Sequence, residues 1–409
     1  MALTDRDDIL LKQEVGTNNG KIGNYRICHL SKYYPPAWGG IETHVQNLAR
    51  AQAALGAQVS VMCVNSMNEA GVQASVTNTV REWDGDVQVT RLGRRTTVAR
   101  FDICPGFPKI FREIVESSYD IVHLHTPNPT MLLAWLAMRP QIPLVITHHS
   151  DVIKQQFLKY VLRSFEHLVY NQAESILTTS PNYIEGSRFL QIYKKNLTYL
   201  PLGLDCSPYL QPSEAALAYS RQLKDKYGAP IWLSVGRLVY YKALDVAIEA
   251  LALVPGTLIV VGTGPLEKEL KDKAKQLGVE ERIVWLGRAS AEELSGAYHA
   301  ATALWFPSNA RSEGYGLVQV EAMASGCPVI NANIPCSGVT WVSRHEQEGL
   351  TVPLNDPVAL ADAAKRLLEE PGLRERLVNA SRSRVSVLDD MTMAKRSFEI
   401  YSQTLNDRS

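Results

Sequence analysis

The sequence has no closely spaced pair of cysteines. Its six cysteines are spread over 409 residues without a C-x-x-C spacing, and several of them lie within apolar runs. They are Cys28, Cys63, Cys104, Cys206, Cys327 and Cys336. This distribution argues against a zinc site and is typical of reduced thiols that pack as small core side chains.

The sequence also lacks a long hydrophobic run and an excess of either charge. No stretch approaches the roughly 20 apolar residues that a membrane span requires, and residues 1–24 contain no secretory apolar region. Lysine plus arginine equals aspartate plus glutamate, at 42 residues each, which argues against a protein that coats nucleic acid. These absences predict a cytoplasmic protein.

Two successive series of short apolar runs alternate with helical segments. Runs that are apolar at every position are typical of parallel strands buried on both faces. The first series comprises 26–30, 59–64, 121–124, 144–147 and 175–179, and the second comprises 231–235, 257–261, 283–286, 303–306, 329–331 and 350–352. The pattern predicts an α/β fold with two doubly wound, Rossmann-like domains that face each other across a cleft.

The chain length suits two domains of about 200 residues each. We place one domain at residues 1–208 and the other at residues 209–385. Residues 386–409 contain a helical segment, 390–405, which can belong to either domain and can pack back on the first.

The segment from Ser308 to Gly326 contains the richest set of polar residues and glycines. Gly314 and Gly316 permit close approach of a ligand, and a helix that begins near Leu317 offers free N–H groups to a diphosphate. Glu321 lies roughly 7–8 Å further along that helix, about the distance from a phosphate to its ribose. A solvated Glu321 and a loop Glu313 remain the alternative interpretation.

Two further segments place cations and glycines at strand ends. Arg237 and Lys242 follow the run 231–235, where either can neutralise a diphosphate or simply face solvent. Gly39 and Gly40 begin the first helix after the run 26–30 and suit phosphate approach, although many such turns are only structural.

These segments together resemble the retaining GT-B glycosyltransferases of family 4, of the type found in bacterial polysaccharide assembly. The resemblance rests on the E-x7-E pair Glu313/Glu321, the Gly-Arg-x4-Lys run, the early Gly-Gly loop and the segment 261–266, in this order. It covers residues 25–369. Ala243 departs from the family pattern, which usually has glycine after the lysine.

The resemblance implies a role for each matched residue. Glu321 would hold the nucleotide ribose, Glu313 the donor sugar, and Arg237 and Lys242 the diphosphate, with Gly40 in support. The base pocket would include Gly262, Gly264, Gly287 and Arg288, and Gly316 and Leu317 would donate backbone N–H groups. Gly39, Gly314 and Tyr315 complete the implied donor-binding set.

Histidines mark the acceptor side. His149 matches the family's T-x-H pattern and is expected at the cleft, with His125 and Asp151 as further candidates and His123 as a structural residue. A packed, satisfied histidine is the alternative for His149. No carboxylate is clearly placed as a nucleophile, so the resemblance implies a same-face substitution in which the leaving phosphate takes the acceptor proton.

No metal and no cofactor are expected, because the nucleotide diphosphate sugar is itself the substrate. The sequence Asp84-Gly85-Asp86 matches a metal-binding D-x-D pattern, but residues 80–83 are too polar for the buried strand that precedes such a site, so we interpret it as a turn.

The resemblance favours UDP-glucose as the donor and GDP-mannose next, with a saccharide or polyprenyl-linked acceptor. A sugar-nucleotide epimerase and a non-catalytic nucleotide-sugar-binding protein remain alternatives. Arg94, Arg95, Arg100, Lys109 and Arg112 lie beside an apolar stripe, Phe107, Ile110, Phe111 and Ile114. This combination suggests peripheral contact with the inner face of a membrane, or an ordinary packed helix.

Overall fold

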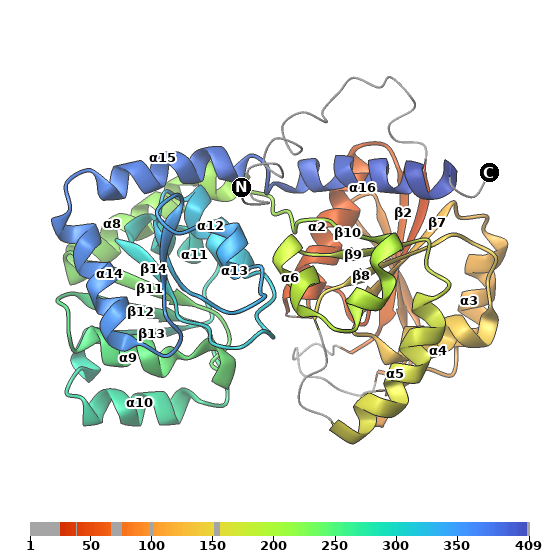
Figure 1. Ribbon diagram of the computed structural model, residues 1–409, viewed down its shortest axis with the longest axis horizontal. Helices are drawn as coiled ribbons and strands as arrows, with labels where there is room; N and C mark the ends of the chain where they lie inside the picture. Colours follow the sequence, from red (N-terminus) through yellow and green to blue (C-terminus); the bar gives the residue numbers. More distant parts are fainter. Residues whose placement is uncertain (1–24, 38, 67–75, 99–100, 151–155, 407–409) are drawn as a thin grey trace.

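The computed structural model describes residues 25–37, 39–66, 76–98, 101–150 and 156–406, with only the backbone for residues 114–115 and 156–162. Figure 1 shows two lobes side by side, each with a sheet covered by helices. The predicted architecture of two doubly wound domains is confirmed.

The N-terminal sheet has eight strands in the order β10-β9-β8-β7-β1-β2-β4-β3, all parallel except β3. Its strands are β1 (Arg26–Leu30), β2 (Gln58–Val64), β3 (Val80–Asp84), β4 (Val87–Leu92), β7 (Ile121–Thr126), β8 (Leu144–His148), β9 (Ser175–Thr178) and β10 (Leu197–Tyr199). The order reverses between β1 and β7, and the crevice at such a reversal is where doubly wound sheets bind ligands.

The C-terminal sheet has six strands in the order β13-β12-β11-β14-β15-β16. They are β11 (Ile231–Val235), β12 (Thr257–Val261), β13 (Ile283–Gly287), β14 (Ala303–Phe306), β15 (Val329–Ala332) and β16 (Gly349–Val352), and every pair is parallel. Here the order reverses between β11 and β14, which places the second crevice at the ends of these two strands.

Helices cover both faces of each sheet, as the crossover connections of parallel strands require. The N-terminal lobe contains α2 (Gly40–Ala54), α3 (Phe107–Glu116), α4 (Pro129–Met138), α5 (Gln156–Tyr170), α6 (Pro181–Gly186), the 3-10 helix η1 (Leu190–Asn196) and the short strands β5 (Thr96–Val98) and β6 (Phe101–Ile103). The C-terminal lobe contains α7 (Ser207–Leu210), α8 (Glu214–Tyr227), η2 (Tyr240–Lys242), α9 (Leu244–Leu251), α10 (Glu267–Gln276), η3 (Glu280–Arg282), α11 (Ala291–Ala300), α12 (Leu317–Ala324), α13 (Val339–Val342), α14 (Pro357–Glu369) and α15 (Leu373–Val385).

The last helix, α16 (Asp390–Asn406), returns to the N-terminal lobe and lies along α2 (Figure 1). Its Phe398 and Tyr401 are buried in the same core cluster as Val45 and Leu48 of α2. The structure therefore decides which lobe this helix covers, a choice that the sequence left open.

The segment before Gly85 is polar for a reason that the structure makes plain. Residues 80–84 form β3, an antiparallel edge strand whose residues are mostly exposed, so no buried strand precedes Gly85, as the sequence predicts. The turn at Gly85 and Asp86 joins β3 to β4 as expected. Asp84 accepts hydrogen bonds from Tyr34 and Gln46 and forms an ion pair with Arg50, so these partners occupy its carboxylate.

The thiols mostly follow the prediction. Five of the six cysteines are buried and unpaired, and Cys336 is exposed.

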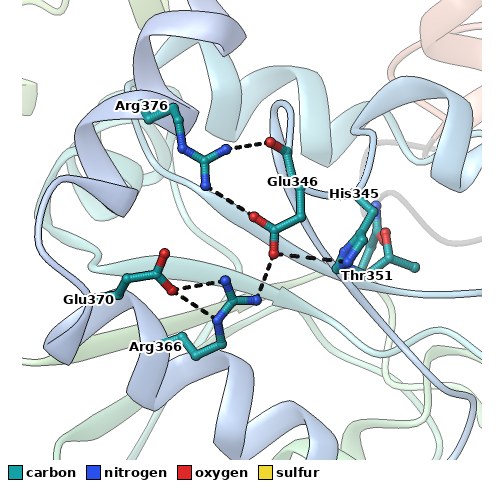
Figure 2. A network of polar contacts seen from close by, with 7 residues as sticks. His345, Glu346, Thr351, Arg366, Glu370 and Arg376 are labelled. Carbon is teal, nitrogen blue, oxygen red and sulfur yellow. Dashed lines mark hydrogen bonds and ion pairs between the residues drawn. The ribbon is translucent and has the colours of Figure 1, made fainter.

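A polar network fastens the loop before β16 to α14 and α15 (Figure 2). Arg366 and Arg376 both pair with the carboxylate of Glu346, at 2.6 and 3.0 Å, and Arg366 also pairs with Glu370 at 2.9 Å. The side chains are about one third to one half exposed, so each pair stabilises the fold by less than about 1 kcal/mol. The network thus joins the loop before β16 to the two helices that follow this strand.

Candidate active site

The crevice of the C-terminal lobe lies where β11 and β14 end. Its walls include Gly236, Arg237, Lys242, Phe306, Pro307 and Ser308. The fold thus places the two predicted cations at the position where open α/β sheets bind their ligands.

Lys242 is the central charge of this crevice. Its Nζ lies 2.6 Å from Oε2 of Glu313 and 4.8 Å from the centre of the Phe306 ring, and both charged side chains are nearly buried. The Ser308 hydroxyl also donates to Oε2 of Glu313, at 3.3 Å. A diphosphate that bound Lys242 would release the Glu313 carboxylate to accept hydrogen bonds from sugar hydroxyls.

Glycines let the loops after β11 and β12 touch. Gly236 has a φ of 142° and a Cβ there would lie 3.0 Å from Cε of Lys242, while a Cβ on Gly262 would overlap the carbonyl of Gly236. Gly264 likewise packs against the backbone of Leu238. Gly262 N–H donates to the carbonyl of Gly287, at 2.7 Å, so the predicted base-pocket glycines form one continuous edge.

Helix α12 begins at this crevice. Gly316 at its N-cap has a φ of 80°, and a Cβ there would lie 2.7 Å from the ring of Phe306. No side chain caps the helix. The N–H of Gln319 donates to the carbonyl of Gly316, and the N–H of Leu317, which precedes it, remains available for a ligand. The Tyr315 side chain packs in the core near Trp341, so only its backbone can serve a donor.

Two tyrosines hold Glu321. The hydroxyl of Tyr298 on α11 donates to Oε2 of Glu321 at 2.6 Å, and Tyr209 of α7 also bonds this carboxylate. Burial raises the pKa of the Glu321 carboxyl, while the Tyr298 hydroxyl and the charge of Lys242 act to lower it. The carboxylate keeps acceptor sites for a diol, since each oxygen can accept more than one bond.

The beginning of α2 carries a carboxylate of its own. Oε2 of Glu42 occupies the space next to Gly39, whereas the space beside Gly40 is open, and donor binding by these two glycines stays a prediction. Burial raises the pKa of Glu42, while its own backbone N–H, Lys32 and Arg237 lower it. Sequence reasoning singled out Gly39 and Gly40 but missed Glu42.

His149 lies where the two lobes meet. Its carbonyl oxygen is 3.0 Å from the position that a Cβ of Gly314 would take. Its Nε2 is 3.1 Å from Nδ1 of His125, whose Nε2 is 3.0 Å from Nδ1 of His29. His44 packs edge-on against His149, at 4.9 Å between ring centres, and neither of its ring nitrogens has a hydrogen-bond partner.

The neighbouring histidines are structural. His123 is fully buried between Tyr401 and Thr147, at 2.6 and 2.7 Å, as expected from the sequence. His148 contacts the hydroxyl of Tyr170 at 2.7 Å, so its side chain faces the core and not the histidine cluster.

Histidines are also the possible metal ligands within the described residues. The groups His29/His123/His125 and His44/His125/His149 each have ring nitrogens within 4.8 Å of one another. Sequence reasoning missed His29 and His44, although the carboxyl ends of three neighbouring strands all carry histidine. Most of these nitrogens are already hydrogen-bonded to one another or to neighbouring side chains, which disfavours a metal, and metal independence stays a prediction.

Arg311 is a further interface residue that the sequence analysis missed. From the C-terminal lobe it donates to the carbonyls of Gly186 and Tyr183, at 2.6 and 3.0 Å, and lies 4.3 Å above the Tyr183 ring. It holds the segment that contains Glu313 against the N-terminal lobe.

Two predictions from the sequence, membrane contact by the apolar stripe and an acceptor-side role for Asp151, gain no support. Phe107, Ile110 and Phe111 of the apolar stripe pack on the N-terminal core, so they are not free to enter a membrane. Asp151 lies outside the described residues. None of the described helices is long and apolar enough to cross a membrane.

Two family models match the chain. Residues 218–384 match the family described as Glycosyl transferases group 1, and residues 39–203 match the Glycosyl transferase 4-like domain. The chain is 30% identical to the D-rhamnosyltransferase WbpZ of Pseudomonas aeruginosa, over 86% of this chain and 89% of that protein. It is 28% identical to the O-antigen chain mannosyltransferase C of Escherichia coli, over 88% and 93% of the two chains.

Solved structures show the same fold. Sucrose-phosphate synthase from Thermosynechococcus elongatus superposes with a TM-score of 0.74 at 23% identity, over 94% of this chain and 100% of that chain. Anabaena Alr3699/HepE in complex with UDP-glucose superposes with a TM-score of 0.72 at 20% identity, over 93% and 100%.

Proposed function

Because the chain belongs to the GT-B glycosyltransferases with a group 1 domain and a family 4-like domain, we propose that it is a retaining, metal-independent hexosyltransferase. It transfers a sugar in polysaccharide biosynthesis.

The observation that carries the proposal is the pairing of Lys242 with Glu313 at the β11/β14 crevice, beside the open end of α12. An entering diphosphate takes Lys242 and Arg237 as counter-charges and the N–H groups of α12 as hydrogen-bond donors. Glu313 then turns to the sugar, and Glu321 receives the ribose diol.

The reaction follows from this placement. The bond between the anomeric carbon and the phosphate oxygen breaks as negative charge grows on the diphosphate, which the cations and helix stabilise. The acceptor hydroxyl attacks from the same face and gives its proton to the departing phosphate oxygen. The protein contributes positioning and charge stabilisation, with no covalent intermediate.

The donor is proposed to carry a mannose-configured sugar. By their names, the relatives from Pseudomonas aeruginosa and Escherichia coli transfer D-rhamnose, which is 6-deoxymannose, and mannose. This favours GDP-mannose, the second choice from the sequence. UDP-glucose, the first choice, is supported by the fold neighbour in complex with it.

Nucleoside diphosphate release will test the donor and the reaction class. We expect the purified protein to release GDP from GDP-mannose faster than UDP from UDP-glucose, with a large increase when a saccharide acceptor is added. Release that no acceptor changes, together with conversion of the donor to another sugar nucleotide, would indicate an epimerase. Binding without release would indicate a non-catalytic protein.

Replacing Glu321 with glutamine tests the ribose contact. We expect the KM for the donor to rise by about 10-fold to 100-fold while kcat changes little, because a charge-assisted hydrogen bond contributes about 1.5–3 kcal/mol to both bound states. Initial rates over a range of donor concentrations measure both constants. Glu267→Gln on the exposed face of α10 is the matched control, and equal KM values in the two variants would refute the assignment.

A further inference from the structure

Three imidazoles form a buried chain that ends at Gln52. Oε1 of Gln52 lies 2.8 Å from Nε2 of His29, and the chain continues through His125 to His149 at 3.0 and 3.1 Å. A neutral imidazole has one donor and one acceptor nitrogen. The position of the proton on one ring therefore determines its position on the next ring. The group at the Gln52 end thus decides which nitrogen of His149 is protonated.

Helix α16 fixes the Gln52 end. The Ser397 hydroxyl donates to the carbonyl of Ala394 at 2.7 Å, so towards Gln52, at 2.8 Å, it can only accept. The Gln52 atom that faces Ser397 must then be the amide nitrogen, and the oxygen faces His29. Tyr401 agrees with this orientation, because its hydroxyl can accept from Gln52 and donate to His123.

The orientation passes along the chain one ring at a time. Since Oε1 of Gln52 only accepts, His29 carries its proton on Nε2 and presents a bare Nδ1 to His125. His125 then donates from Nε2 and accepts at Nδ1 from Nε2 of His149. Burial lowers the pKa of His29 to about 4 and the pKa values of His125 and His149 well below the usual value, so the rings are neutral at pH 7.

We propose that Gln52, oriented by Ser397 and Tyr401 of α16, is a positioning residue that holds His149 in the Nε2–H tautomer. Nε2 of His149 is committed to His125, so Nδ1 is the nitrogen left for a substrate, and it can accept a hydrogen bond but not donate one. The role in catalysis rests on the proposed function: a sugar hydroxyl at His149 has to be the donor.

The arrangement has a second state that α16 excludes. If the Gln52 amide rotated by half a turn, its NH2 group would face His29 and every ring of the chain would move its proton from Nε2 to Nδ1. His149 would then present a donor where it now presents an acceptor. A wrong histidine tautomer can cost several orders of magnitude in turnover when the ring contacts the reacting groups.

The test is ¹⁵N NMR of the full-length chain labelled at histidine, with donor kinetics on the same samples. Ring nitrogen shifts distinguish a protonated from a bare nitrogen, and the spectrum of His149→Asn identifies the resonances of His149. We expect the wild-type ring to be Nε2–H. In Gln52→Leu, and to a smaller degree in the milder Ser397→Ala, we expect the Nδ1–H form to appear.

We expect kcat to fall at least about threefold in both variants, while the KM for the donor stays within about twofold. The matched control is Thr404→Ala on the same helix. Its buried hydroxyl contacts the Ser175 hydroxyl at 2.9 Å and bonds none of the histidines or Gln52. This variant should change neither the tautomer nor the rate.

A wild-type His149 that carries its proton on Nδ1 would overturn the inference, as would a tautomer that neither variant alters. A changed tautomer with an unchanged kcat would overturn the positioning role. Failure of the proposed function is separate, because it would appear as wild-type protein that transfers no sugar while the NMR spectra still report the tautomer.

Discussion

Replacing Lys242 with alanine is expected to lower kcat by more than about tenfold, with a similar loss for Arg237→Ala. Lys242 lies at the β11/β14 crevice, where negative charge develops as the diphosphate departs. Its side chain is only 13% exposed, so little water is present to replace its charge. Removing one preorganised donor to such a charge commonly costs about 2.7–4 kcal/mol, which corresponds to a factor of about 100 to 1,000.

Turnover at saturating donor, measured by nucleoside diphosphate release, checks this prediction. Lys271→Ala, which removes an exposed lysine on α10, provides the control for loss of a charge elsewhere. Because Lys242→Ala also leaves Glu313 without its cation, thermal unfolding of each variant has to show that the fold persists. Near-unchanged turnover in both the Lys242 and Arg237 variants would exclude them from the reaction.

The architecture could be predicted from the sequence because the local pattern of apolar residues indicates where the buried strands lie. Parallel strands buried on both faces are apolar at every position, so β11, β12 and β14 have the same bounds in the prediction and in the structure. The edge strand β3 was missed for the opposite reason, since a strand that is exposed on both faces carries no hydrophobic signal.

The candidate site was accessible only where a motif concentrates its residues. Glu313 and Glu321 are eight positions apart, and the structure brings both close to Lys242. Tyr298 and Tyr209, which hold Glu321, come from separate helices and have no fixed spacing to it in the sequence. Such contacts depend on how helices pack, and one sequence does not specify that locally.

The histidine cluster illustrates both sides of this limit. Alternation along β7 predicts that His123 and His125 share one face of the strand, and they do stack at 4.5 Å. Their different roles depend on α16, which is separated from β7 by more than 260 residues. Of these two histidines, only His123 is hydrogen-bonded to α16, through the hydroxyl of Tyr401. The sequence left that helix unassigned, so the link between Gln52 and His149 was beyond its reach.

The same cluster should make the N-terminal lobe sensitive to acid. Burial lowers the pKa of His29 to about 4 and that of His44 to about 3, whereas both groups have a pKa of about 6.5 when unfolded. Between these values the unfolded chain binds more protons than the folded chain. The stability that the neutral rings allow is therefore complete above about pH 6.5 and falls as the pH drops towards 4 and 3.

His44 provides the sharpest test, because its ring nitrogens are buried without partners and an aromatic ring of similar shape can replace it. From pH 7.5 to 4.5 its share of the lost stability is about 2–3 kcal/mol. We therefore expect His44→Phe to lose that much less free energy of unfolding than the wild type over this range, measured by urea denaturation at both pH values. His345→Gln, at an exposed histidine, should follow the wild type.

Raised carboxyl pKa values at Glu42 and Glu321 act in the opposite direction in all three proteins, so the comparison between variants isolates the histidine. An equal loss in His44→Phe and the wild type would show that His44 is protonated in the folded protein or that the lobe opens around it.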